Sequence, residues 1–247
     1  MSHPNSENQL HKNTGQLKLI VVQDQLQACP YLADTTARMP LRLPVGDVTP
    51  AATDHLLELG YRRSGDFVYR TQCPACVACQ PTRVRLGSFK MTGSMKRVLK
   101  RGDRDLTCSW DQPIVDQQRV DMFNQHRGQR NLGSGEEVDA RSYGAFLNDS
   151  CCDTIELSIR LNNQLIAVAI IDVGSTSVSA VYTHFDPAMS RYSLGTYAIL
   201  KQLQWAKESG RKFVYLGMYV ANNSHLNYKA RFGPQERLFD GKWQEVT

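Results

Sequence analysis

The stretch SVSAVYTHFDPAMSRYSLGTYAILKQL, residues 177–203, decides the fold class of this chain. It begins with a run typical of a strand, turns at Pro187, and continues as a helix in which Ile199 and Leu203 recur at helical spacing. Two strand-like runs precede it, TIELSIRL and LIAVAIIDV, and a third, KFVYLG, follows the end of the helix at Gly210. The C-terminal half therefore alternates several strands with one long helix.

This order of elements is shared by many N-acyltransferases. It predicts an α+β fold with an acetyltransferase-like (GNAT-like) mixed sheet in the C-terminal half, residues 151–247. In that fold two central strands splay apart, and the carbonyl of the acyl donor lies in the gap between them. Because one fold supports many reactions, the order of elements predicts the architecture and leaves the chemistry to the side chains.

The N-terminal half, residues 17–150, is predicted to form a smaller α/β part that carries most of the cysteines. It opens with the strand-like run LKLIVV, and the pair Thr49-Pro50 is typical of a helix start. The segment between this strand and the helix is expected to be a loop. A turn at Ser64–Asp66 predicts a hairpin, and two further helices are predicted at 114–128 and 139–148.

Composition excludes several classes of protein. Apolar residues make up 41% and charged residues 21%, which is typical of a globular chain. No run of about 18 apolar residues is present to span a membrane. Residues 1–16 are polar and lack the apolar core of a secretory signal, so they are predicted to be a disordered tail. An odd count of seven cysteines without such a signal favours a reducing, cytoplasmic compartment over a disulfide framework.

The segment SMKRVLKRGDR, residues 94–104, predicts an amphipathic helix with a nearly uniform positive face. At about 100° per residue, five cations fall on one side and the apolar Met95, Val98 and Leu99 on the other. This basic face consists of Lys96, Arg97, Lys100, Arg101 and Arg104. A solvated helix face usually mixes both signs. We therefore favour a polyanionic partner over plain solvation, with contacts to nucleic-acid phosphates rather than to bases.

The heptapeptide CPACVAC, residues 73–79, raises the question of a bound metal. Cys73, Cys76 and Cys79 are spaced at three-residue steps, and Cys29 lies further upstream. Structural zinc usually takes two separated cysteine pairs, whereas a C-x₂-C-x₂-C run is found in iron–sulfur proteins. The spacing leaves zinc, an iron–sulfur cluster and a purely structural role open. No histidine lies nearby in the sequence, which disfavours a nucleophilic cysteine.

Several stretches together resemble a known family: CPYLADTTARMPLRLP, LGYRRSGDFVYRTQCPACVACQPTRV, the basic segment, and AVYTHFDPAMSRYSLGTYAILKQ…YLG…YKARFGPQERL. They resemble the arginyl-tRNA–protein transferase family, in its bacterial branch that transfers leucine to proteins beginning with Asp or Glu. The resemblance covers roughly residues 17–245. It departs at Asn223 and His225, where the family pattern has Cys and Lys. That departure leaves the choice between a leucyl and an arginyl donor open.

The resemblance implies a cytoplasmic aminoacyl-tRNA–protein transferase. Its partners would be leucyl-tRNA and acceptor proteins with an N-terminal Asp or Glu, and its product would carry an N-degron that directs it to proteolysis. The resemblance also implies that four cysteines belong together in the N-terminal part, where eukaryotic relatives are associated with an iron–sulfur cluster. These are Cys29, Cys73, Cys76 and Cys79.

The implied reaction joins an activated ester to an α-amine with a pKa of about 7.7–8.0. Because roughly a tenth of that amine is already neutral at pH 7, positioning contributes more than a strong base. Backbone N–H groups at Ser193–Gly195 are candidates for stabilising the oxyanion. Asp186 is a candidate for holding the incoming ammonium, and a turn-forming Asp before Pro187 is an equally good interpretation. Tyr182 and Tyr228 are candidates for orienting groups.

An acidic N-terminal side chain favours an arginine as its partner, because the guanidinium fork matches a carboxylate. The candidates are Arg38, Arg42, Arg83 and Arg231. Lys229 and Arg231 are also candidates for contacts with the 3′ end of the tRNA, with a solvated surface position as the alternative.

Two rival functions fit parts of the sequence. An acyl-CoA N-acetyltransferase needs a glycine-rich pyrophosphate loop before the 195–209 helix, but RYSLGT supplies only Gly195. A non-catalytic metal-containing RNA-binding module explains the cysteines and the basic face, but leaves the whole C-terminal half without a task. The sequence therefore favours aminoacyl transfer over both rival functions.

Overall fold

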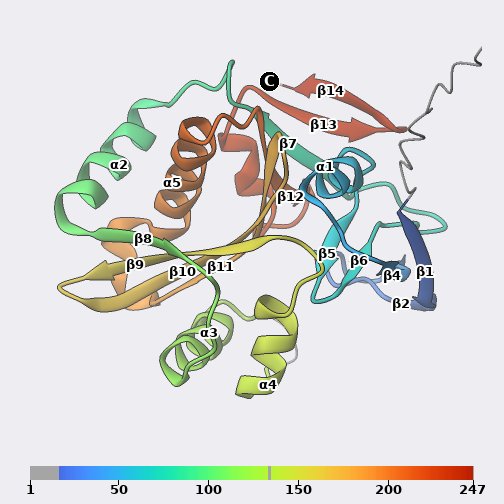
Figure 1. Ribbon diagram of the computed structural model, residues 1–247, viewed down its shortest axis with the longest axis horizontal. Coiled ribbons are helices and arrows are strands. Elements are labelled where there is room, and N and C mark those ends of the chain that lie inside the picture. The colour runs from blue at the N-terminus through green and yellow to red at the C-terminus, as the bar shows by residue number, and fades with distance from the viewer. Residues whose placement is uncertain (1–16, 133–134, 247) are drawn as a thin grey trace, which may run out of the picture.

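The structure is a computed structural model that describes residues 17–132 and 135–246. The tail predicted at residues 1–16 lies outside the described residues. An eight-stranded sheet with helices on both faces stands beside a smaller four-stranded sheet (Figure 1). In the described part of the chain, no helix combines the length and apolar character needed to cross a membrane.

The large sheet is mixed, as predicted, with the strand order β14-β13-β7-β12-β11-β10-β9-β8. Its neighbours pair antiparallel except β11 and β12, which run parallel. The bounds are β7 Gln80–Arg85, β8 Thr107–Asp111, β9 Thr154–Leu161, β10 Gln164–Val173, β11 Ser177–Phe185, β12 Phe213–Tyr219, β13 Gln235–Phe239 and β14 Lys242–Val246. Strands β7 and β8 precede residue 150, so the sheet draws on both halves of the chain. The division of the chain near that residue stays a prediction.

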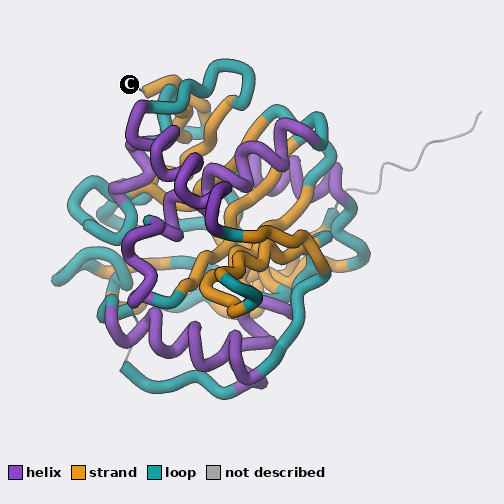
Figure 2. Tube along the Cα trace, turned by 90° about the vertical axis from the view of Figure 1, so that its left-hand side faces the viewer, coloured by secondary structure: helices purple, strands orange, loops and turns teal. Residues whose placement is uncertain are grey.

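Helices cover both faces of this sheet (Figure 2). On one side α5 packs on β11 and β12 and in turn carries α2, while α3 and α4 lie on the other side. Their bounds are α2 Gly93–Asp105, α3 Gln117–Gln129, α4 Ala140–Tyr143, continued by the π-helical turn η1 Gly144–Asn148, and α5 Leu194–Glu208. Strand β10 alternates between the two cores: Ile166 and Ala169 pack towards α5, whereas Val168 and Ile170 pack towards α3. Burial on both faces explains why β10 is almost continuously apolar.

The smaller sheet has the order β1-β4-β6-β5, and α1 (Pro50–Glu58) lies against it. Its strands are β1 Lys18–Gln23, β4 Leu41–Val45, β5 Arg62–Ser64 and β6 Phe67–Tyr69, and β2 Leu26–Ala28 pairs with β3 Thr36–Arg38. The loop expected between the first strand and α1 is thus wrong, because it contains β2, β3 and β4. Pro40 and Pro44 interrupt the alternating pattern there and remove backbone donors, which hides these strands in the sequence.

The helix starts follow the local sequence. Thr49 accepts a hydrogen bond from the backbone N–H of Ala52, and Asp139 accepts one from Ser142 at 2.7 Å. Each such N-cap contributes about 1 kcal/mol to helix stability. These caps confirm the predicted starts of α1 and of the 139–148 helix.

Candidate active site between two splayed strands

The parallel strands β11 and β12 separate soon after they meet. Their pairing covers only Ser177–Ser179 opposite Phe213–Tyr215, although β11 continues to Phe185 and β12 to Tyr219. Past Ser179 and Tyr215 the two backbones no longer bond to each other. The predicted gap between two central strands is therefore present, and it opens at these two residues.

A pocket of about 1170 Å³ occupies this gap. Its walls come from β5, β6, α3, β11, the start of α5, β12 and the short 3₁₀ helix η3 (Asn227–Arg231). Six cationic side chains line it, and within the described chain no Asp or Glu does. These cations are Arg62, Arg63, Arg127, Arg130, Lys229 and Arg231. A lining of one sign in a concave, partly dry site attracts an anionic group.

Three of the four predicted catalytic residues line the pocket: Tyr182, Gly195 and Tyr228. Asp186 does not. Its carboxylate accepts a hydrogen bond from the backbone N–H of Ala188 at 2.9 Å and begins the 3₁₀ helix η2 (Pro187–Tyr192). This contact matches the turn-forming interpretation of Asp186.

The start of α5 faces the pocket. Ser193 adopts a left-handed conformation, with φ 51° and ψ 50°, and so turns the chain sharply from η2 into α5. Leu194, Gly195 and Thr196 follow and line the pocket. The first N–H groups of a helix have no partner within the helix and carry partial positive charge. This is where the oxyanion donors were predicted.

Lys229 lies inside the protein rather than on its surface. Only 6% of the residue is exposed, and its Nζ donates to the carbonyl oxygen of Met218 at 2.6 Å. Burial, together with the nearby charge of Arg62, lowers the pKa of Lys229 to about 7. Gly217, beside Met218, has a φ of +89°, a backbone conformation that favours glycine.

The arginines predicted to read the acidic side chain occupy different environments. Arg38 forms a surface pair with Asp24 at 2.5 Å, and Arg42 donates to the carbonyl oxygen of Pro40 at 3.1 Å. Neither lines the pocket, whereas Arg231 does and is exposed.

Arg83 is buried outside the pocket and its donors are already engaged. Its Nε donates to Glu236 at 2.6 Å, and its Nη1 donates to Glu58 and to the hydroxyl of Tyr215. With two carboxylates beside it, the charge of Arg83 is balanced within the fold. These partners could not be predicted from local sequence, because Glu236 follows Arg83 by 153 residues.

The basic face predicted on α2 is exposed, while Met95 and Gly102 are buried against α5. The C-terminal end of α2 contacts η2: Arg101 donates to the carbonyl oxygen of Arg191, and the hydroxyl of Tyr192 donates to Asp105 at 3.2 Å. Ser190 of η2 lines the pocket. The C-terminal end of α2, which carries Arg101, therefore lies beside η2 and close to this wall of the pocket.

The four cysteines of the N-terminal part gather around Cys79. Burial, followed by the proximity of Cys29, Cys73 and Cys76, raises the pKa of Cys79 to about 12. All four are free thiols. Over residues 17–132 and 135–246, no three His, Cys, Asp or Glu side chains converge as a metal-ligand set. The metal or cluster predicted at these cysteines therefore stays a prediction, and no chemical step is assigned to one.

Helix α3 supplies pocket residues that sequence reasoning missed. Phe123, His126, Arg127 and Arg130 all line the pocket from it. The Nδ1 of His126 accepts from the backbone N–H of Phe185 at 3.4 Å, and burial with the charge of Arg130 lowers the pKa of His126 to about 4. The run HRGQR carried a signal, since it places basic and aromatic residues on one helix, but nothing local shows which surface covers it.

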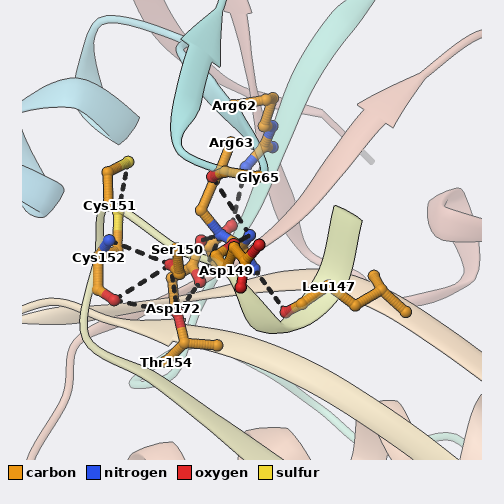
Figure 3. Close-up of polar contacts among 11 residues, drawn as sticks. Arg62, Arg63, Gly65, Leu147, Asp149, Ser150, Cys151, Cys152, Thr154 and Asp172 are labelled. Atoms are coloured by element: carbon orange, nitrogen blue, oxygen red, sulfur yellow. Dashed lines mark hydrogen bonds and ion pairs between the residues drawn. The ribbon is translucent and has the colours of Figure 1, made fainter. Parts of the chain in front are cut away.

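A buried ion pair links the β5–β6 hairpin to strand β10 of the large sheet (Figure 3). This hairpin lies beside the pocket. The Nε of Arg63 donates to both carboxylate oxygens of Asp172, at 2.9 and 3.0 Å. Thr154 adds a hydrogen bond to Asp172 at 2.8 Å. Burial raises the pKa of Asp172, and the charge of Arg63 opposes that rise.

Comparison with known proteins identifies relatives over almost the whole chain. The sequence models for the arginine-tRNA-protein transferase N terminus and C terminus match residues 27–97 and 118–239. The chain is 36% identical over 221 residues to an aspartate/glutamate leucyltransferase from Acinetobacter baumannii, covering 89% of this chain and 81% of that protein. It is 35% identical over 219 residues to one from Aeromonas hydrophila, covering 88% and 91%.

Among solved structures, the C-terminal domain assigned to a lysylphosphatidylglycerol synthetase from Agrobacterium fabrum is similar, with a TM-score of 0.50 and 16% identity. The similarity covers 90% of this chain and 82% of that one, and it concerns the fold alone. The predicted acetyltransferase-like fold agrees with the splayed mixed sheet. Matched by both sequence models and more than one-third identical to two members along most of its length, the chain belongs to the arginine-tRNA–protein transferase family.

Proposed function

We propose that this protein transfers leucine from leucyl-tRNA to the α-amine of proteins that begin with Asp or Glu. The two curated relatives are aspartate/glutamate leucyltransferases, and the chain spans at least 81% of each. The observation that carries the proposal is the pocket at the strand gap, where six cations and, among the described residues, no carboxylate form the lining. Such a lining suits an acceptor whose first side chain is an anion.

The chemistry needs little more than correct positioning. The neutral α-amine attacks the ester carbonyl, an amide bond forms, and the ester C–O bond breaks. The departing ribose oxygen of the tRNA takes up the proton that the amine loses. N–H groups at the start of α5, around Gly195, stabilise the oxyanion, and Tyr182 and Tyr228 orient the two substrates. Holding amine and ester in contact is worth an effective molarity of about 10⁵ M or more.

The tRNA is bound by the basic face of α2 and by the arginines at the pocket rim. From Arg101, beside η2, the cations extend five residues back to Lys96, which is about 7.5 Å along the helix. Phosphates of the acceptor stem bind this surface and the aminoacylated 3′ end enters the pocket. We further propose that the reaction takes place in the cytoplasm, where leucyl-tRNA is made, and that the leucylated products are degraded.

A peptide-transfer assay tests the proposal. Purified protein is given leucyl-tRNA carrying radiolabelled leucine and peptides that begin with Asp, Glu, Asn or Gln. We expect label on the Asp and Glu peptides and none on the same peptides with an acetylated N-terminus. Arginyl-tRNA is tested in parallel as a donor. Asn223 and His225 depart from the family pattern, and this departure leaves the choice between a leucyl and an arginyl donor open.

The rival function is tested in the same assay with acetyl-CoA as donor. Transfer from acetyl-CoA together with no transfer from either aminoacyl-tRNA would replace aminoacyl transfer by acetylation. Labelling of Asp and Asn peptides at equal rates would retain the transferase and remove the acidic specificity.

A further inference from the structure

Two consecutive arginines of β5 have opposite environments. Arg63 is engaged by Asp172 and also donates to the carbonyl oxygen of Asp149 at 3.1 Å (Figure 3). Arg62 is 7% exposed and lines the pocket, and its Nη1 donates to the hydroxyl of Ser179 at 3.5 Å. Within residues 17–132 and 135–246, its Nε and Nη2 have no partner. Buried donors without partners destabilise a fold, so Arg62 needs an explanation that Arg63 does not.

The unpartnered edge of Arg62 is the one that binds carboxylates elsewhere in this chain. In Arg38 the Nε and Nη2 atoms donate to the two oxygens of Asp24 at 2.7 and 2.5 Å. The same edge of Arg104 binds Asp105 at 2.6 and 2.9 Å. Arg85 with Glu236 and Arg119 with Glu156 use it as well. This side-on fork matches the spacing of carboxylate oxygens.

Arg62 also lies where the two strands separate. Ser179, its weak partner, is the last residue of β11 that pairs with β12, and the ring centroid of Tyr215, the opposite residue, is 5.8 Å from its guanidinium carbon. Lys229 also lines the pocket, where its Nζ donates to the carbonyl oxygen of Met218 on β12. A carboxylate at this point is within one side-chain length of an α-amine in the gap.

We propose that Arg62, with Lys229 as a second donor, binds the side-chain carboxylate of the acceptor's N-terminal Asp or Glu and so selects acidic N-termini. This assignment rests on the proposed function. The Nε and Nη2 edge faces no solvent, so the Arg62 side chain must turn to meet the carboxylate. The 3.5 Å contact with Ser179 is at the limit of hydrogen bonding and opposes that turn only weakly.

Two other cations of the pocket, Arg63 and Arg231, fit this task less well. Arg63 is occupied by Asp172, and Arg231 is exposed to water, which competes for its donors. A charge-assisted hydrogen bond is stronger in a buried site than in water. The buried fork of Arg62 is therefore assigned to the acceptor and the exposed arginines to the RNA.

The variants Arg62→Gln and Arg62→Lys test the assignment. Arg160→Gln is the matched control. Arg160 lies on β9, bonds only to the carbonyl oxygen of Asn163 among the described residues, and does not line the pocket. We expect the native protein to prefer an Asp over an Asn peptide by about 100-fold or more in kcat/KM. Arg62→Gln reduces that ratio to within about tenfold, Arg62→Lys gives an intermediate ratio, and the KM for leucyl-tRNA stays unchanged.

A second measurement separates this inference from the proposed function. Calorimetric titration of the full chain with the Asp and Asn peptides, without any tRNA, measures the acidic preference even if no leucine is transferred. An Asp/Asn ratio that Arg62→Gln leaves unchanged, while activity on both peptides falls equally, would overturn the assignment. A higher KM for leucyl-tRNA with the ratio retained would assign Arg62 to the RNA instead. Thermal unfolding of each variant shows whether it is folded. If Arg62→Gln does not fold, the Asp/Asn ratio of Arg62→Lys tests the assignment instead.

Discussion

Tyr197 of α5 lies directly against the backbone of Gly102 in α2. A β-carbon built on Gly102 would come within 2.2 Å of Cε2 in the tyrosine ring. The hydroxyl of the same tyrosine donates to Asp103 at 2.9 Å. This close contact holds α2 on α5, and it thereby keeps the basic face of α2 beside the rim of the pocket.

Gly102→Ala is expected to destabilise the protein. The added methyl group would force α2 away from the Tyr197 ring, and such overpacking costs about 1–3 kcal/mol. Gly128→Ala is the matched control, because Gly128 is exposed in α3 and a β-carbon there meets nothing within 4 Å. We expect that control to be neutral or stabilising by up to about 1 kcal/mol. Urea unfolding of both variants checks the pair, and equal stabilities would contradict the close contact.

Charge reversal on α2 is expected to weaken tRNA binding. Lys96→Glu with Lys100→Glu removes two contacts to phosphates, so the dependence of log KM for leucyl-tRNA on log salt becomes shallower by about 0.7–0.9 per contact. Lys18→Glu with Lys242→Glu makes the same change in net charge on the exposed strands β1 and β14. If both double variants change the salt slope equally, α2 binds no phosphate and the effect is one of net charge alone.

Lys229 is expected to make stability depend on pH. Its pKa is lowered to about 7 in the folded protein, chiefly by burial, from an ordinary value of 10.5. Between these values the unfolded chain binds a proton that the folded chain does not, so stability rises with pH by up to about 1.4 kcal/mol per unit. Lys229→Met should lose this contribution and the exposed Lys242→Met should keep it. Urea unfolding at pH 6 to 9 measures the unfolding free energy of each variant relative to the native protein. A difference for Lys229→Met that does not vary with pH would contradict the lowered pKa.

Breaking the Arg63–Asp172 pair is expected to be severe. Asp172→Asn leaves Arg63 buried opposite a neutral amide, and loss of one partner in a buried pair costs about 3–5 kcal/mol. Asp105→Asn, which disrupts an ion pair with the exposed Arg104, should leave the unfolding free energy nearly unchanged. Chemical denaturation compares the two, and a mild effect at Asp172 would show that Arg63 is held by the backbone carbonyls instead.

The metal-binding interpretation of the cysteine spacing, as opposed to a purely structural role, predicts that protein purified without oxygen contains iron or zinc. Cys79→Ser should remove that metal, because the other three thiols gather around Cys79, whereas Cys108→Ser should retain it. Elemental analysis and the visible absorption spectrum of both variants give the answer. A colourless, metal-free protein that transfers leucine at the full rate would end the cluster hypothesis.

Most elements of the fold were predictable, because their signals are local. The strands β9, β10 and β11 show as alternating or continuous apolar runs, α2 shows as an amphipathic helix, and Thr49 and Asp139 mark helix starts. Strands β2, β3 and β4 were missed, since each is short and prolines interrupt the segment. Tyr182, Gly195, Tyr228 and Arg231 were chosen from the sequence and do line the pocket.

The family, the order of elements, the cationic helix and the strand gap were all predictable from local sequence. What each cation does depends on tertiary contacts: Lys229 is buried at the gap, Arg83 pairs with two glutamates, and Arg62 has a fork without partners among the described residues. Local patterns depend on neighbours three or four residues away. The state of a charged side chain depends instead on which surface covers it: Ser179 lies 117 residues from Arg62, and Glu236 lies 153 residues from Arg83.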